Sequence, residues 1–135
     1  MKGTFQNRAA MFAIALSLGV ALVGAHALAA LDLVVGARGV IPNTPITDCD
    51  TRAKAALASQ LQGVFEAGTG THQWIANSAP DNRGNYSAAA VIHCFPTSNG
   101  YSYTITCSAQ VPPNPQTATD LCAKIGAAFA PAGGQ

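Results

Sequence analysis

YSYTITCSAQV, from Tyr101 to Val111, alternates apolar and polar residues more regularly than any other stretch of this chain. Side chains of a β-strand point to alternate faces. One face would carry Tyr101, Tyr103, Ile105, Cys107 and Ala109, and the other Ser102, Thr104, Thr106 and Ser108. A face made of Ser and Thr alone is typical of the solvated side of an antiparallel sheet. The segment therefore predicts a strand that covers a core with its other face.

Two more strands are predicted upstream of this one. YSAAAVIHCF (Tyr86–Phe95) is joined to it by PTSNG, in which Asn-Gly is a strong hairpin signal. HQWIANS (His72–Ser78) comes before the turn Ala79–Asn85, which is dense in Pro, Asp, Asn and Gly. Because short turns join neighbouring antiparallel strands, the three segments predict a three-stranded antiparallel meander.

Helical patterns flank the predicted strands. The first helix should begin at Thr47 or Asp48 and stop at Gly68, with an apolar stripe at helical spacing. The stripe consists of Ala53, Leu57, Leu61, Val64 and Phe65. The second helix should run from about Thr117 to Phe129, with Thr117 and Asp120 at capping-box spacing. The expected fold is a small single α+β domain of order α-β-β-β-α, with both helices on the apolar face of the sheet.

The N-terminus has the composition of a secretory signal peptide. Lys2 and Arg8 precede an apolar segment from Ala9 to Ala25, and small-residue cleavage patterns follow up to Ala29. We therefore expect residues 1–29 to be removed on export, which makes the protein secreted or periplasmic. An uncleaved signal anchor is the alternative.

The rest of the chain divides into three parts. Residues 30–46 are an extended arm or a short strand, because LDLVVGARGVI alternates for a few steps and is then interrupted by Gly and Pro. Residues 47–130 form the domain. Residues 131–135 form a frayed tail.

The charge of the mature chain argues against polyanionic partners. After residue 29 the chain carries six acids and five bases, a net charge of −1. Such a domain has no long-range field that would attract nucleic acid or an anionic membrane surface. A protein or an envelope component remains as the expected partner, and the sequence does not indicate an oligomeric state.

Four cysteines, all of them after the predicted signal, indicate two disulfides. They are Cys49, Cys94, Cys107 and Cys122. Cys94 and Cys107 flank the Asn-Gly hairpin, so the favoured pairing is Cys94–Cys107 with Cys49–Cys122. The alternative is Cys49–Cys94 with Cys107–Cys122, which ties each helix to the sheet. The spacings match no zinc motif, and no metal or other cofactor is expected.

Candidate binding residues are few: His72, His93, Arg83 and Tyr101. His93 and Cys94 are neighbours on one strand and so face opposite ways, which excludes a nucleophilic pair. His72 is expected to approach His93 from the paired strand, but no third metal ligand is apparent.

No catalytic residue can be assigned, because the chain has no nucleophile motif and no phosphate-binding loop. The sequence favours a non-catalytic binding module that uses the turns Ala79–Asn85 and Pro96–Tyr101. The alternative is a small secreted hydrolase that uses His72 or His93 with Glu66 or Asp81 as the carboxylate.

Overall fold

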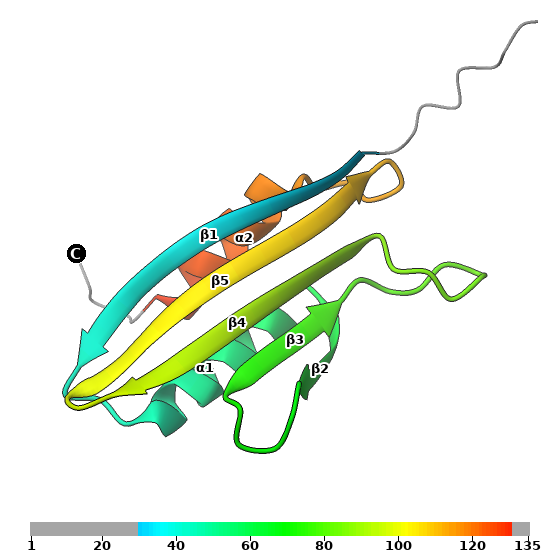
Figure 1. The fold of residues 1–135 in the computed structure, drawn as a ribbon. Helices are drawn as coiled ribbons and strands as arrows, with labels where there is room; N and C mark the ends of the chain where they lie inside the picture. Colours follow the sequence, from blue (N-terminus) through cyan, green and yellow to red (C-terminus); the bar gives the residue numbers. More distant parts are fainter. Residues whose placement is uncertain (1–29, 131–135) are drawn as a thin grey trace, which may run out of the picture.

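The computed structural model describes residues 30–130, and Figure 1 shows their arrangement. In chain order the elements are β1 (Ala30–Pro42), α1 (Ile46–Ala58), β2 (Gln62–Glu66), β3 (Gln73–Asn77), β4 (Ala88–Thr97), β5 (Gly100–Val111) and α2 (Ala118–Phe129). The predicted signal peptide (1–29) and frayed tail (131–135) lie outside the described residues.

All strands belong to one antiparallel sheet in the order β1-β5-β4-β3-β2. The α+β class is confirmed, but the sheet has five strands where three were predicted. The predicted meander is its centre, β3-β4-β5. The segment 30–46 contributes a strand of 13 residues, β1, which pairs with β5 along nearly its whole length. Its alternation is hidden in the sequence because a bulge between Val35 and Arg38 shifts the register.

The second additional strand, β2, comes from residues that were predicted to be helical. The helix α1 ends at Ala58, and Gln62–Glu66 pairs with β3 at the other edge of the sheet. Leu61, Val64 and Phe65 fit a helical stripe as well as a strand, so periodicity misleads here. Gly63, with φ of +60°, has a left-handed backbone that is incompatible with a continuing right-handed helix.

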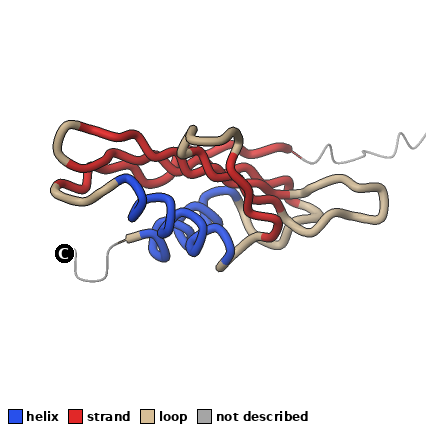
Figure 2. Tube along the Cα trace, turned by 90° about the horizontal axis from the view of Figure 1, so that it is seen from below, coloured by secondary structure: helices blue, strands red, loops and turns tan. Residues whose placement is uncertain are grey.

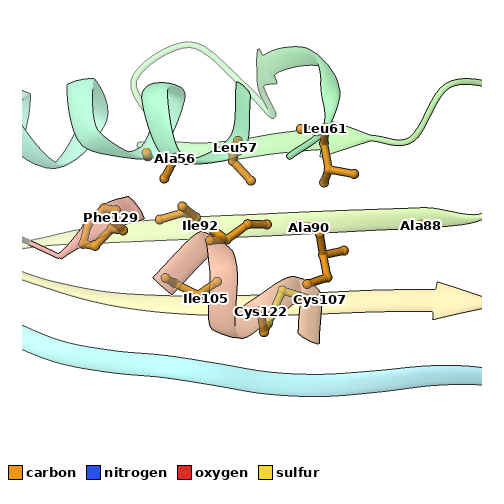
Figure 3. Close-up of a cluster of buried hydrophobic side chains, with 14 of the residues drawn as sticks. Ala56, Leu57, Leu61, Ala88, Ala90, Ile92, Ile105, Cys107, Cys122 and Phe129 are labelled. Atoms are coloured by element: carbon orange, nitrogen blue, oxygen red, sulfur yellow. A yellow bond between two sulfur atoms is a disulfide. The ribbon is translucent and has the colours of Figure 1, made fainter. Parts of the chain in front are cut away.

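Both helices cover the same face of the sheet, as Figure 2 shows. The helix-facing residues of β4 and β5 are buried together with the inner sides of α1 and α2 (Figure 3). They include Ala90, Ile92, Ile105, Leu57, Ile125 and Phe129. The second helix begins as predicted, because the Thr117 hydroxyl accepts a hydrogen bond from the Asp120 N–H at 3.1 Å. Within residues 30–130, no helix lies on the other face of the sheet.

The favoured disulfide pairing is wrong. Cys49 bonds to Cys94 and Cys107 to Cys122, with Cα separations of 6.1 and 5.6 Å. The reason is the β4–β5 hairpin, which turns at Ser98–Asn99 and pairs Thr97 with Gly100.

In this register Cys94 lies opposite Tyr103, and Cys107 lies opposite Ala90. The two cysteines are therefore four positions apart along the strands, about 13 Å. A disulfide needs Cα atoms within about 7 Å of each other. Each cysteine of the sheet bonds instead to the helix above it, so that α1 is joined to β4 and α2 to β5.

Candidate functional site

The two histidines lie on opposite sides of the sheet. His93 is opposite Thr104 and Gln73, on the face without helices, and its ring lies 3.9 Å from that of Phe95. His72 precedes β3 and contacts Asp50 of the helix α1, with 2.9 Å between Nδ1 and Oδ2. The predicted approach of His72 to His93 holds for their backbones, because the Cys94 N–H donates to the His72 carbonyl. Their side chains do not converge on one site.

His72 belongs to a polar cluster between α1 and β3, the Asp50 cluster, which consists of Asp50, Lys54, His72 and Trp74. Asp50 accepts a hydrogen bond from Trp74 Nε1 at 2.8 Å in addition to the His72 contact. The Lys54 ammonium lies 4.2 Å from the centre of the Trp74 ring, within the range of a cation–π interaction. Sequence reasoning missed Asp50, although Asp50 and Lys54 are four apart on a helix and therefore share a side.

The backbone of His72 is fixed by its neighbours. It has a left-handed φ of +53°, its N–H donates to Glu66 Oε1 at 3.0 Å, and its carbonyl accepts from Cys94. Left-handed backbone at a residue other than glycine is uncommon and is kept only where the surroundings hold it. A carboxylate that orients an imidazole is one part of a general-base pair. In residues 30–130, however, no Ser or Thr hydroxyl bonds to either imidazole, and all four cysteines are in disulfides.

Arg83 lies in the turn Ala79–Asn85, here called the 79–85 loop, which extends beyond the end of the sheet (Figure 1). Asp81 organises this loop. Its Oδ1 accepts the backbone N–H groups of Arg83 and Asn85, both at 2.8 Å, and its Oδ2 accepts Asn85 Nδ2 at 3.2 Å. These backbone hydrogen bonds from Asn85 and Arg83 lower the pKa of Asp81 below its ordinary value. The Asp81 carboxylate is thus hydrogen-bonded to groups of its own loop.

The base of the 79–85 loop is also hydrogen-bonded. The Ser78 hydroxyl accepts the N–H groups of Ser87 and Ala88, at 3.0 and 3.3 Å. Asn114, from the segment before α2, donates to the Ser87 hydroxyl at 3.3 Å. These hydrogen bonds hold the two ends of the loop together where it leaves the sheet.

Open hollows lie on two sides of the 79–85 loop. One of about 830 Å³ extends toward Gln110 and Pro113, and one of about 300 Å³ extends toward Phe65 of β2. Pro80 and Tyr86 line both, and Tyr86 is 56% exposed. Arg83 is exposed, and within the described part of the chain its guanidinium forms no ion pair. The loop therefore presents a cation on a fixed backbone, and Tyr86, the residue directly after it, presents an aromatic ring.

Tyr101 is part of the core and does not face solvent. Its side chain is fully buried, and its hydroxyl donates to Asp48 Oδ2 at 2.9 Å. Burial, followed by the hydrogen bond to Asp48, raises the pKa of Tyr101 to about 12. Arg52 pairs with the same carboxylate at 2.6 Å and lowers the pKa of Asp48. Tyr101 was a candidate binding residue, but its burial and its hydrogen bond to Asp48 give it a structural role.

Within residues 30–130, no group of three or more His, Cys, Asp or Glu side chains is arranged to hold a metal ion. In the same range, neither helix is long and apolar enough to cross a bilayer. Comparison of the chain with family models, curated proteins and solved structures finds no match. Function must therefore be argued from the residues themselves.

Proposed function

We propose that this protein is an exported binding module without catalytic activity, and that the 79–85 loop is its contact surface. The observation that carries the proposal is the hydrogen bonding of Asp81, which fixes the loop and leaves Arg83 exposed at the end of the sheet. The two disulfides are consistent with an oxidising compartment outside the cytoplasm.

A fixed loop is suited to binding for an energetic reason. Ordering a flexible segment on association costs free energy, and this cost offsets part of the stabilisation that the interface supplies. The Asp81 and Ser78 hydrogen bonds order this loop before any partner arrives. Binding residues are often located on loops held by a rigid scaffold, and the disulfide-bonded sheet supplies that scaffold.

Arg83 of the loop and the neighbouring Tyr86 indicate the chemistry of the partner. Arg and Tyr are both enriched among residues that dominate binding energy. Because the Asp81 carboxylate is engaged with Asn85 and the backbone, Arg83 is available to a carboxylate on another molecule. We infer that the partner, a protein or an envelope component, presents a carboxylate to Arg83.

Site-specific photo-crosslinking in the native host tests this proposal. A photoreactive residue replaces Asn82 in the loop, and a matched variant carries it at Thr51, which is exposed on α1. The proposal expects one discrete adduct from position 82 and none from position 51. Equal adducts from both positions, or no adduct from the loop, would contradict it.

The Asp50–His72 contact favours one second candidate, a small hydrolase in which Asp50 orients His72 as a general base. Glu66 and Asp81, the carboxylates predicted for this role, have other partners: Glu66 accepts the His72 backbone N–H, and Asp81 bonds within its loop. A panel of ester, amide and phosphodiester substrates separates the two functions. Turnover that His72→Ala abolishes and His93→Ala preserves would establish the hydrolase; the binding module predicts no turnover.

A further inference from the structure

The hollow of about 300 Å³ beside the 79–85 loop lies at the β2 edge of the sheet, on the face opposite the helices. The strand β3 ends at Asn77, where the chain continues toward the loop, and Gln62 of β2 lies directly opposite Asn77. Ala89, the β4 partner of Asn77, stands between two buried alanines, so this row of side chains points away from the helices. The volume is at the lower end of what is usual for ligand sites.

A bulge in β2 turns a second side chain toward the same hollow. Residues three apart on a regular strand point to opposite faces. Between Gln62 and Phe65, however, the register with β3 shifts, so that Phe65 lies opposite Ile75, two positions from Asn77. Gln62 and Phe65 therefore share a face, and both line the hollow. Bulges are over-represented beside active sites, where they re-aim a side chain in this way.

Two aromatic side chains border the hollow and remain exposed. Phe65 is 48% exposed and Tyr86 is 56% exposed, and both line the hollow together with Pro80. The face of an aromatic ring is electron-rich, so it attracts the weakly positive C–H groups of a ligand that lies flat on it. The hollow therefore offers flat contact surfaces for C–H groups.

The polar groups of the hollow are uncharged. Its lining includes no Asp, Glu, Lys, Arg or His among the described residues. The Ser78 hydroxyl accepts two backbone N–H groups, whereas within residues 30–130 the side-chain amides of Gln62 and Asn77 have no protein hydrogen-bond partner. Each primary amide supplies two donors and one carbonyl acceptor. The two amides are neighbours, because their residues lie directly opposite each other on paired strands.

We propose that this hollow, here called the Phe65 hollow, binds a neutral segment of an oligosaccharide. A sugar ring has faces of C–H groups that stack on aromatic rings, and hydroxyls around its rim that donate and accept hydrogen bonds as amides do. A hydrocarbon ligand would leave both amides unpaired, which is costly. A charged ligand would meet no opposite charge in the hollow.

Tyr86 indicates that the ligand has more than one sugar unit. Tyr86 and Pro80 also line the larger hollow of about 830 Å³, to which Asn85 and Gln110 add further amides. A chain of sugars that passes over Tyr86 would contact both hollows. Arg83 lines neither of them, so the inference does not rest on the proposed role of Arg83.

Calorimetric titration of the exported protein tests the inference. The probes are uncharged tetrasaccharides of glucose, of mannose and of N-acetylglucosamine, with a proline-rich peptide of similar length for comparison. We expect at least one tetrasaccharide to bind with a dissociation constant below about 1 mM, and the peptide not to bind.

Substitutions at Phe65 separate the ring from its apolar bulk. Phe65→Leu keeps an apolar side chain and removes the ring, so it should weaken sugar binding about tenfold, whereas Phe65→Trp should preserve binding. The matched control is Phe95→Leu, because Phe95 is an exposed aromatic residue of the same sheet that does not line the hollow. It should leave the affinity unchanged.

Three outcomes would overturn the inference: none of the tetrasaccharides binds, the peptide binds in their place, or Phe65→Leu and Phe95→Leu have the same effect. Circular dichroism checks that each variant is folded, and Tyr86→Ala, which should also weaken binding about tenfold, replaces Phe65→Leu if the latter is not. Arg83→Ala should leave sugar binding unchanged. Failure of this inference is therefore distinguishable from failure of the proposed function, which Arg83→Ala and cross-linking from position 82 test.

Discussion

Tyr101 shows how a single polar atom is accommodated in a small core. Its ring is fully buried and its hydroxyl donates to Asp48, which also pairs with Arg52. Tyr101→Phe removes a hydrogen bond to a charged group, so we expect a loss of about 1.5–3 kcal/mol in the free energy of unfolding. Urea denaturation measures it. Tyr103→Phe is the control, because Tyr103 packs on Phe129 and should lose less than about 0.5 kcal/mol.

The same residue predicts the alkaline limit of stability. The folded-state pKa of Tyr101 is about 12, against about 10 for an exposed tyrosine. Because the folded pKa is the higher one, its stabilising contribution is complete below pH 10 and is lost as the pH rises from about 10 to 12. We expect a loss of roughly 2–3 kcal/mol over this interval. Tyr101→Phe should remove most of this alkaline loss of stability. An unchanged dependence of stability on alkaline pH in that variant would contradict the assignment of the loss to Tyr101.

The position of an individual residue was predictable where alternation along one strand decides the face of the sheet to which its side chain points. The placement of His93 on the open face, and its separation from Cys94, are both confirmed. The partner of His72 was not predictable in the same way, because Asp50 is 22 positions away in the sequence. The Asp50 cluster depends on how α1 lies across β3, and local patterns do not specify that geometry.

At the scale of elements, the sequence predicts the centre of the sheet better than its edges. The strands β3, β4 and β5 and the helix α2 are all confirmed, because turn residues bound the strands and a cap marks the start of the helix. The edge strands were less visible. A bulge interrupts β1, and β2 has only five residues with an apolar spacing that also fits a helix.

The disulfides connect each helix to the central strands, and the loops that they close predict their relative importance. Cys49–Cys94 spans 45 residues and Cys107–Cys122 spans 15. Chain entropy gives about 4 and 3 kcal/mol of stabilisation, respectively. We expect the double variant Cys49→Ala/Cys94→Ala to lose more stability in urea than Cys107→Ala/Cys122→Ala. The reverse order would show that native-state packing outweighs chain entropy.

Considered as a whole, the molecule is a sheet with helices on one face and an exposed apolar strand at one edge. Export would place it where its disulfides persist. We expect the intact mass of the protein from its native host to correspond to a start at Leu28 or Ala30. A full-length chain retained in the membrane would show that the N-terminal segment is an anchor.

The central claim is that the 79–85 loop binds a carboxylate of its partner through Arg83. The measurement that tests it most directly is the affinity of the protein for the species cross-linked from position 82, determined by calorimetry. We predict that Arg83→Ala weakens binding tenfold or more, which corresponds to about 1.4 kcal/mol. Lys124→Ala, which removes an exposed cation from α2, should change the affinity less than about twofold. Equal effects of the two substitutions, or none from Arg83→Ala, would contradict the account.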